Sequence, residues 1–255
     1  LINLGHGQNG FLTLALLGGS LVLLDRKPVV AGILIGLLAY KPQFGVLIPL
    51  VLVATGRWQV FAAAAATVVA AFVVTIAAFG IEIWQGFAES TVFTREVVLE
   101  AGNTGWQKIQ SIFSATRMWG GGVEAAYAVQ AVMGFLIAAS LVWLWRSAAD
   151  FRLKAAALAL GSLLATPYVL DYDLVVLAVP IAFVIAHGLD KGFGEFEISL
   201  LVATWVMPLV ARSIAGALYV PVGLIVMMTL YAVIMQRAVR DISVSAVRGP
   251  QHAEV

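Results

Sequence analysis

Long apolar runs alternate with short polar motifs along the whole chain, which is the pattern of a polypeptide that crosses a bilayer repeatedly. The apolar runs cover 10–24, 28–40, 42–54, 58–79, 124–145, 154–167, 168–187, 198–211 and 218–236. A helix needs about 20 apolar residues to cross the hydrocarbon core of a bilayer. The pattern therefore predicts an all-α fold, a polytopic membrane helical bundle of about nine membrane segments.

Two of the runs, 28–40 and 42–54, hold only about 13 residues each, which is too short to cross a core of about 30 Å. They fit either a hairpin of two short helices or one long helix broken at Pro42. The hairpin is favoured because it puts the basic residues that flank both runs on one side of the membrane. Gly32 and Gly36 have the small-xxx-small spacing that permits close helix packing.

The basic residues give the bundle an orientation. With the hairpin, ten of them fall on one side and five on the other. The ten are Arg26, Lys27, Arg57, Arg146, Arg152, Lys154, Lys191, Arg237, Arg240 and Arg248, and the five are Lys41, Arg95, Lys108, Arg117 and Arg212. Because cytoplasmic loops carry an excess of Lys and Arg, the side with ten is predicted to be cytoplasmic. The outer face then holds Gly5–Gly10, Lys41–Gln43, the loop 80–123 and Thr166–Asp173.

The same pattern divides the chain into four sections. Membrane segments with a Gly-Gln-Asn and a Lys-Pro-Gln motif occupy 1–79, an extracytoplasmic loop occupies 80–123, further membrane segments occupy 124–236, and a cytoplasmic tail occupies 237–255. Within the loop, Trp106, Ile109, Phe113, Thr116 and Trp119 recur at steps of three or four residues. This spacing predicts a helix over 106–119 that lies in the outer membrane interface.

The composition is that of a membrane protein, and it excludes several kinds of chemistry. The chain is 62% hydrophobic and 11% charged, with a mean hydropathy of +0.98, whereas soluble domains carry about 25% charged residues. The net charge is +1 and the basic residues are scattered, so nucleic acid is not an expected partner. The absence of cysteine excludes disulfides and thiolate nucleophiles, and three widely separated histidines do not suggest a metal site.

Lys41 is a single cation between two apolar runs, and Pro42 ends the helix beside it. It is either an interfacial lysine that reaches the headgroups or a point charge for a phosphate. Gln43 adds an amide next to it, which favours the second interpretation.

Asp171, Tyr172 and Asp173 follow Thr166-Pro167, a favourable start for a helix. Carboxylates in a first turn are stabilised by the helix dipole, but ionisable groups in a membrane chain are also functional candidates. Positions two apart on an α-helix diverge by about 200°, so the two carboxylates are not predicted to act as a pair.

Gln8 and Asn9, with His6, form a polar motif before the first apolar run. They are either a solvated loop or amides that bind sugar hydroxyls. Gly5, Gly7 and Gly10 have the spacing of a dinucleotide-binding loop, but no strand precedes them, so that interpretation is rejected.

These motifs resemble glycosyltransferase family 87, the polyprenol-phosphate-mannose-dependent α-1,2-mannosyltransferases of GT-C architecture. The resemblance rests on Gly7-Gln8-Asn9, Ala31-Gly32-x-x-x-Gly36, Lys41-Pro42-Gln43 and Arg57-Trp58, and extends to Ala165-Thr166-Pro167. The histidine that many members carry after that proline is absent from 167–173 here.

The resemblance implies a transferase of the plasma membrane with its active site outside the cytoplasm. A hexose, with mannose as the expected sugar, would pass from a polyprenyl-phosphate donor to a hydroxyl of a glycan or glycolipid acceptor, without a metal or other cofactor. It also implies a catalytic aspartate in an outer loop upstream of Leu1, so the chain is expected to be a C-terminal fragment. Lys41, then Lys108 or Arg117, would meet the phosphate, and the amides Gln8, Asn9 and Gln43 would hold the sugar. Asp173 is the expected catalytic residue of this chain, with Asp171 and Tyr172 beside it in the substrate site.

Two other functions fit the same pattern. Polar groups at membrane depth and broken helices also serve transporters and lipid flippases, although no inverted repeat is visible in the sequence. The second of these alternatives is an inactive truncated chain.

Overall fold

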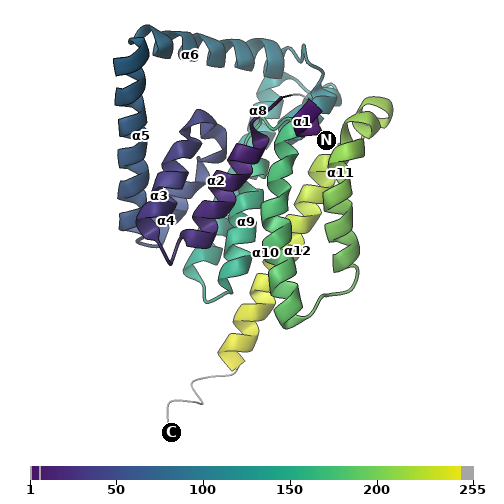
Figure 1. Cartoon of the computed structure of the whole chain (residues 1–255). Helices are drawn as coiled ribbons and strands as arrows, with labels where there is room; N and C mark the ends of the chain where they lie inside the picture. The colour runs from purple at the N-terminus through teal and green to yellow at the C-terminus, as the bar shows by residue number, and fades with distance from the viewer. Residues whose placement is uncertain (1, 6, 248–255) are drawn as a thin grey trace.

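The computed structural model describes residues 2–5 and 7–247, and their regular structure is helical except for one isolated bridge between Ile109 and Leu170 (Figure 1). This confirms the predicted all-α bundle. The α-helices are α1 (Ile2–Gly5), α2 (Gly10–Leu23), α3 (Pro28–Leu37), α4 (Leu47–Ala54), α5 (Trp58–Phe79), α6 (Glu82–Phe93), α7 (Ile112–Met118), α8 (Val123–Arg146), α9 (Phe151–Leu164), α10 (Ala178–Lys191), α11 (Glu197–Leu218) and α12 (Val222–Val247). Short 3₁₀ segments cover Leu38–Tyr40, Pro42–Phe44, Trp106–Lys108 and Asp171–Leu177, and a π-helical segment covers Thr94–Glu100.

Within the described residues, five helical stretches are long and apolar enough to cross a membrane. They are Trp58–Phe79, Val123–Arg146, Asp171–Lys191, Glu197–Leu218 and Val222–Ser243. Three shorter apolar helices cover Gly10–Leu23, Pro28–Tyr40 and Pro42–Ala54. The remaining predicted segment, 154–167, corresponds to α9, so each of the nine segments is helical and the protein is a multi-pass membrane protein.

Helices α3 and α4 form the predicted hairpin, with its tip at Lys41 (Figure 1). The turn before α3 and the turn after α4 lie at the same end of the bundle, because the guanidinium of Arg57 donates to the carboxylate of Asp25. One long helix broken at Pro42 would separate these two residues by the height of the bundle. The hairpin prediction is confirmed.

Gly32 and Gly36 let α3 pack directly against α5. A Cβ on Gly32 would lie 2.5 Å from Cβ of Ala63 and 2.5 Å from the carbonyl oxygen of Val60, and one on Gly36 would lie 2.5 Å from Cβ of Thr67. All three distances are far shorter than a van der Waals contact, so only glycine fits at the two positions. The small-xxx-small spacing therefore marks a helix interface, as predicted.

Helix α9 is the centre of the core. From Leu158 to Leu164 every residue is buried, and α9 contacts α4, α8, α10 and α12. Its alanines and Gly161 are small enough for neighbouring helices to approach from all sides. A helix of 14 residues can thus occupy the membrane interior because protein, not lipid, surrounds it.

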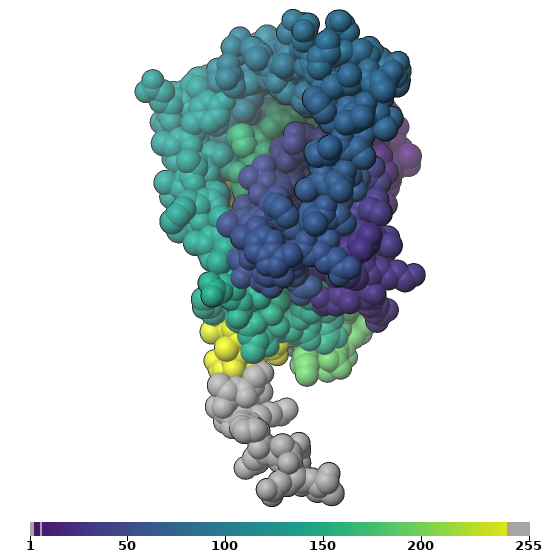
Figure 2. All heavy atoms as spheres, turned by 90° about the vertical axis from the view of Figure 1, so that its left-hand side faces the viewer, coloured from purple at the N-terminus to yellow at the C-terminus, as the bar shows by residue number. Residues whose placement is uncertain are grey.

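Helix α6 turns away from α5 and runs across one end of the bundle (Figure 1), and none of its residues is buried. Gly80 makes the corner with a φ of +81°, a conformation that glycine adopts without strain. Figure 2 shows that the face framed by α5, α6 and α8 is hollowed, with the α3–α4 hairpin visible inside.

The prediction of a single interfacial helix over 106–119 is wrong. The segment consists of the 3₁₀ turn Trp106–Lys108 and helix α7, with extended backbone at Ile109 between them. The backbone N–H of Gln110 donates to the carbonyl of Val169 at 2.7 Å, and Phe113 is fully buried. The aromatic periodicity therefore reflects packing against the protein's own bundle.

Candidate functional site

A buried ion pair at the α6 end of the bundle joins Lys41 to Asp173. The Lys41 ammonium lies 2.6 Å from Oδ1 of Asp173, and the two side chains are 13% and 1% exposed. Pro42 prevents the helix from continuing, so Lys41 stands between two 3₁₀ turns with φ −132° and ψ 71°. This break turns the lysine inward toward the segment that carries Asp173.

Asp173 occupies the first turn of the 3₁₀ segment Asp171–Leu177. Its second oxygen, Oδ2, accepts the backbone N–H of Leu170 at 3.2 Å, so one carboxylate caps a helix and pairs with a lysine. The cap is Leu170 and not Thr166, which corrects the predicted helix start at Thr166-Pro167. A buried ion pair of this kind is costly to break, typically about 3–5 kcal/mol when one partner is removed.

Two aromatic rings complete the surroundings of the Lys41 ammonium. The nitrogen lies 5.2 Å from the ring centroid of Tyr172 and 5.9 Å from that of Phe44, within the range of a cation–π attraction. An ammonium has three N–H donors and Asp173 takes one of them. Lys41 is therefore held in place while retaining donors for another anion.

The N-terminal motif approaches this site through its backbone. The carbonyl of Asn9 accepts the hydroxyl of Tyr40 at 3.4 Å, and that hydroxyl also lies 2.6 Å from Oγ1 of Thr13. In the orientation that satisfies both of its ends, the Asn3 amide donates to the Gln8 carbonyl at 2.7 Å and accepts the N–H of Gly10 at 3.0 Å. The side chains of Gln8 and Asn9 are exposed, and His6 lies outside the described residues. Thr13, Tyr40 and Asn3 were not predicted, and of these only Tyr40, beside Lys41, has a sequence signal.

Gln43 is half-buried, and the described part of the chain offers it no hydrogen bond. It follows Lys41 by two residues and belongs to the 3₁₀ turn Pro42–Phe44. Its amide therefore remains available beside the site.

Asp171 has a different partner from Asp173. Its Oδ2 lies 3.8 Å from Nη1 of Arg212 on α11, and the side chains are 3% and 44% exposed. Arg212 was counted only as a loop charge, although a lone arginine within an apolar run is itself a signal.

The loop cations have different surroundings. Arg117 donates to the carbonyls of Gly121 at 2.8 Å and Glu100 at 3.0 Å, and it stacks on Trp106 with 4.7 Å to the ring centroid. Arg117 therefore stabilises the 80–123 loop by joining two of its parts. Lys108 is half-buried, and among the described residues it makes no ion pair. It precedes Ile109, which bridges to Leu170, so its backbone lies close to the Asp171 segment.

One cluster at the opposite end has the composition of a metal site. Ligand atoms of Asp150, His187 and Asp241 lie within 4.8 Å of one another. Arg237 Nη1 lies 2.8 Å from Nδ1 of His187, and because arginine can only donate, the ring proton must be on Nε2. Nδ1 is thus occupied by the guanidinium and Nε2 carries the proton, so neither ring nitrogen is free to bind a metal ion. Arg152 binds both oxygens of Asp150 and holds the pKa of that carboxyl below its usual range. The cluster is therefore a structural polar contact between helices and not a metal site.

Helices of spanning length and a buried lysine–aspartate pair define a multi-pass membrane protein with a polar site at one end of its bundle. A family model for glycosyltransferase family 87 matches residues 1–167, more than half of the chain, and the chain belongs to this family. Asp171 and Asp173 lie just beyond the matched residues. Comparisons with curated proteins and with solved structures give no significant match. Membership implies a membrane glycosyltransferase, with a sugar donor, an acceptor and the lipid bilayer as partners.

Proposed function

We propose that the protein transfers a hexose, with mannose as the first candidate, from a polyprenyl-phosphate sugar to a hydroxyl of a glycan or glycolipid. The observation that carries the proposal is the Lys41 ammonium, fixed at one end of a membrane bundle by a carboxylate and two aromatic rings. A transferase that uses a lipid phosphate needs such a cation at the depth of the headgroups.

Lys41 would stabilise the leaving group. The acceptor oxygen attacks the anomeric carbon, the bond from that carbon to the phosphate oxygen breaks, and the lipid leaves as a polyprenyl phosphate. The phosphodiester becomes a monoester and gains negative charge, so it needs a positive charge nearby and not a proton. The acceptor proton passes to a carboxylate base, and the configuration at the anomeric carbon is inverted.

Asp173 is better suited to position Lys41 than to act as that base. It is 1% exposed, and its two oxygens bind the ammonium and the N–H of Leu170. A base must reach the acceptor hydroxyl, which this geometry does not permit without breaking the pair. We therefore assign proton abstraction to the acidic residue that the family resemblance places in an outer loop upstream of Leu1.

The sugar would be held by neutral polar groups near the pair. Gln43 beside Pro42 and the exposed side chains of Gln8 and Asn9 supply amides, and Tyr172 supplies a ring beside the ammonium. Lys108 directly precedes the residue that bridges to Leu170, whereas Arg117 already binds the carbonyls of its own loop. Arg117 therefore ranks below Lys108 as a phosphate contact.

The lipid part of the donor would arrive from the side. The hollow between α5, α6 and α8 in Figure 2 opens toward the α3–α4 hairpin, whose tip carries Lys41. The charge distribution supports an active site outside the cytoplasm, because the end opposite Lys41 carries most of the basic residues. In a bacterial-type cell this membrane would be the plasma membrane.

A transfer assay tests the function. Purified full-length protein in lipid is given radiolabelled polyprenyl-phosphate mannose and a mannoside acceptor, with a nucleotide-diphosphate mannose as the comparison donor. The proposal expects a labelled product from the polyprenyl-phosphate donor and none from the nucleotide donor. Movement of the intact lipid across vesicles without any transfer would favour a flippase instead.

A further inference from the structure

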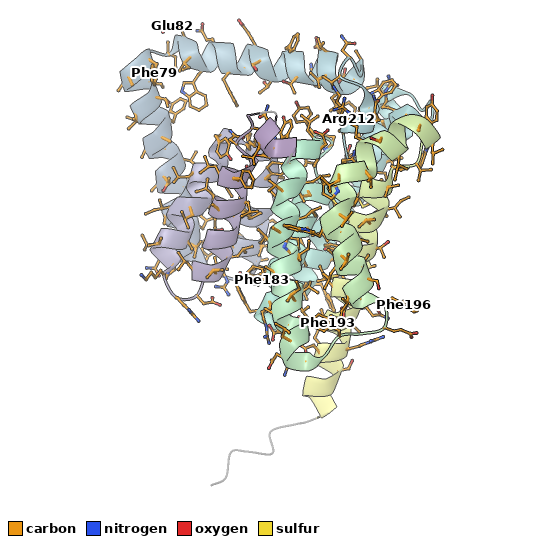
Figure 3. The ribbon with its side chains drawn as sticks, turned by 45° about the vertical axis from the view of Figure 1, so that its right-hand side comes forward. Phe79, Glu82, Phe183, Phe193, Phe196 and Arg212 are labelled. Atoms are coloured by element: carbon orange, nitrogen blue, oxygen red, sulfur yellow. The ribbon has the colours of Figure 1, made fainter. Side chains whose placement is uncertain are left out.

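Arg212 is an arginine inside a membrane-spanning helix with most of its hydrogen-bonding capacity unused. It lies in α11, one of the helices long enough to cross the bilayer, and its side chain is 44% exposed. Figure 3 shows Arg212 at the same end of the bundle as Phe79 and Glu82, opposite Phe193 and Phe196. A charge in such a position is costly, so it requires a partner or a function.

The partner that Arg212 has is a weak one. Asp171 is almost completely buried, yet its Oδ2 lies 3.8 Å from the guanidinium, beyond hydrogen-bond distance. Among the described residues no acceptor takes a hydrogen bond from Arg212. The carboxylate therefore holds the guanidinium at the site electrostatically and leaves its five N–H donors for a further anion.

Most other cations at this end already have a partner within the protein. Lys41 pairs with Asp173 at 2.6 Å, and Arg117 donates to two carbonyls of its own loop. Arg95 pairs with Glu96 and Glu100. Lys108 has no such partner in the described structure, but it offers a single point charge, whereas a guanidinium binds two phosphate oxygens in parallel.

Arg212 and Lys41 have their carboxylate partners on the same short segment. Asp171 and Asp173 belong to the same 3₁₀ segment, in which two residues advance by about 4 Å along the axis. Helices α2 and α11 both pack on this segment. One carboxylate thus holds the lysine and the other the arginine, on different sides of a single turn.

We infer that Arg212 binds the phosphate of the polyprenyl-phosphate donor, and of the polyprenyl phosphate that leaves, through its guanidinium. This inference rests on the proposed function, because it names the residue that binds the phosphate of the proposed lipid substrate. Asp171 acts as a positioning residue that keeps the arginine at the site when no lipid is bound.

Equilibrium binding of two probes tests the inference. The probes are a polyprenyl monophosphate and the uncharged polyprenol of the same length, and the protein is the purified membrane protein. Arg212→Gln should weaken binding of the phosphate at least tenfold and leave polyprenol binding unchanged, and Arg212→Lys should recover part of the loss. Arg26→Gln, which removes an exposed cation at the opposite end, is the matched control and should bind both probes normally.

Equal weakening of both probes by Arg212→Gln, or unchanged phosphate binding, would overturn the inference. If Arg212→Gln does not fold because Asp171 loses its counter-ion, the double variant Asp171→Asn/Arg212→Gln removes both charges. That variant should fold and show the same selective loss, and normal phosphate binding by it would equally refute the role of Arg212. If Arg212→Gln selectively loses phosphate binding but the unmodified protein transfers no sugar, the inference stands and the proposed function is refuted. If the unmodified protein transfers sugar but Arg212→Gln binds the phosphate normally, the proposed function stands and the inference is refuted.

Discussion

The ammonium of Lys41 and the carboxylate of Asp173 lie 2.6 Å apart although 132 positions separate them in the chain. The contact ties the tip of the α3–α4 hairpin to the 3₁₀ segment that leads into α10. A break in one helix and the first turn of another are thus combined into one polar site. The chemistry proposed here depends on that pair.

Replacing Asp173 should reduce activity more than replacing Asp171. Asp173→Asn can still accept the N–H of Leu170, but it no longer fixes the ammonium, so we expect at least a tenfold loss of transfer, about 1.4 kcal/mol. Asp171→Asn should lose less, because Asp171 faces Arg212 and not Lys41. Steady-state transfer by both variants, with thermal melting beside it, is the measurement. If Asp173→Asn melts at a lower temperature but turns over normally, the residue is structural only.

A methyl group on Gly36 should loosen the bundle. The added Cβ would meet Thr67 at 2.5 Å and the Ala64 carbonyl at 2.7 Å, and overpacking of this kind typically costs about 1–3 kcal/mol. Gly36→Ala should therefore lower the melting temperature. Gly86→Ala on α6 is the control, since no atom lies within 4 Å of its Cβ and alanine is the better helix former by about 1 kcal/mol. Equal melting of both variants would show that α3 and α5 do not pack as described.

The α6 end of the bundle should face outward. The chain has no cysteine, so single cysteines report orientation directly. Ser90 on α6 and Glu195 in the turn before α11 are both exposed, whereas Ser114 in the same loop region is 1% exposed and unsuitable. In intact cells an impermeant thiol reagent should label Ser90→Cys and spare Glu195→Cys until the membrane is opened. The opposite pattern would invert the proposed topology and move the active site to the cytoplasm.

Much of the fold could be predicted because it depends on local pattern. Apolar length located the helical segments, the basic residues around 26 and 57 selected the hairpin, and Gly32 and Gly36 marked a helix interface. Helix α6 was missed because its apolar residues are interrupted by polar ones and no buried face gives it a period. The spacing of Trp106 and Phe113 was misread because packing within the loop and packing on a membrane produce similar periods.

The site was predicted as separate residues and not as an arrangement. Lys41 and Asp173 each carried a local signal, a cation between apolar runs and an acid after a proline. Their pairing depends on the way α3 and the Asp171–Leu177 segment pack, which no short stretch of sequence encodes. Arg212 also has a local signal, a lone arginine in an apolar run, but its pairing with Asp171 on another segment depends on packing in the same way.

The central claim is that Lys41 stabilises the departing lipid phosphate and does more than neutralise Asp173. The most direct measurement is the rate of mannose transfer from polyprenyl-phosphate mannose by Asp173→Asn and by Asp173→Asn/Lys41→Met, at equal amounts of folded protein. In the Asp173→Asn variant Lys41 has no Asp173 carboxylate to neutralise, so any further loss of rate on removing Lys41 reports its contact with the substrate phosphate. The account predicts a further loss that corresponds to about 2–4 kcal/mol, the value typical of a lost charge-stabilising donor. Equal rates for the two variants would contradict it and return Lys41 to the role of a counter-ion for Asp173.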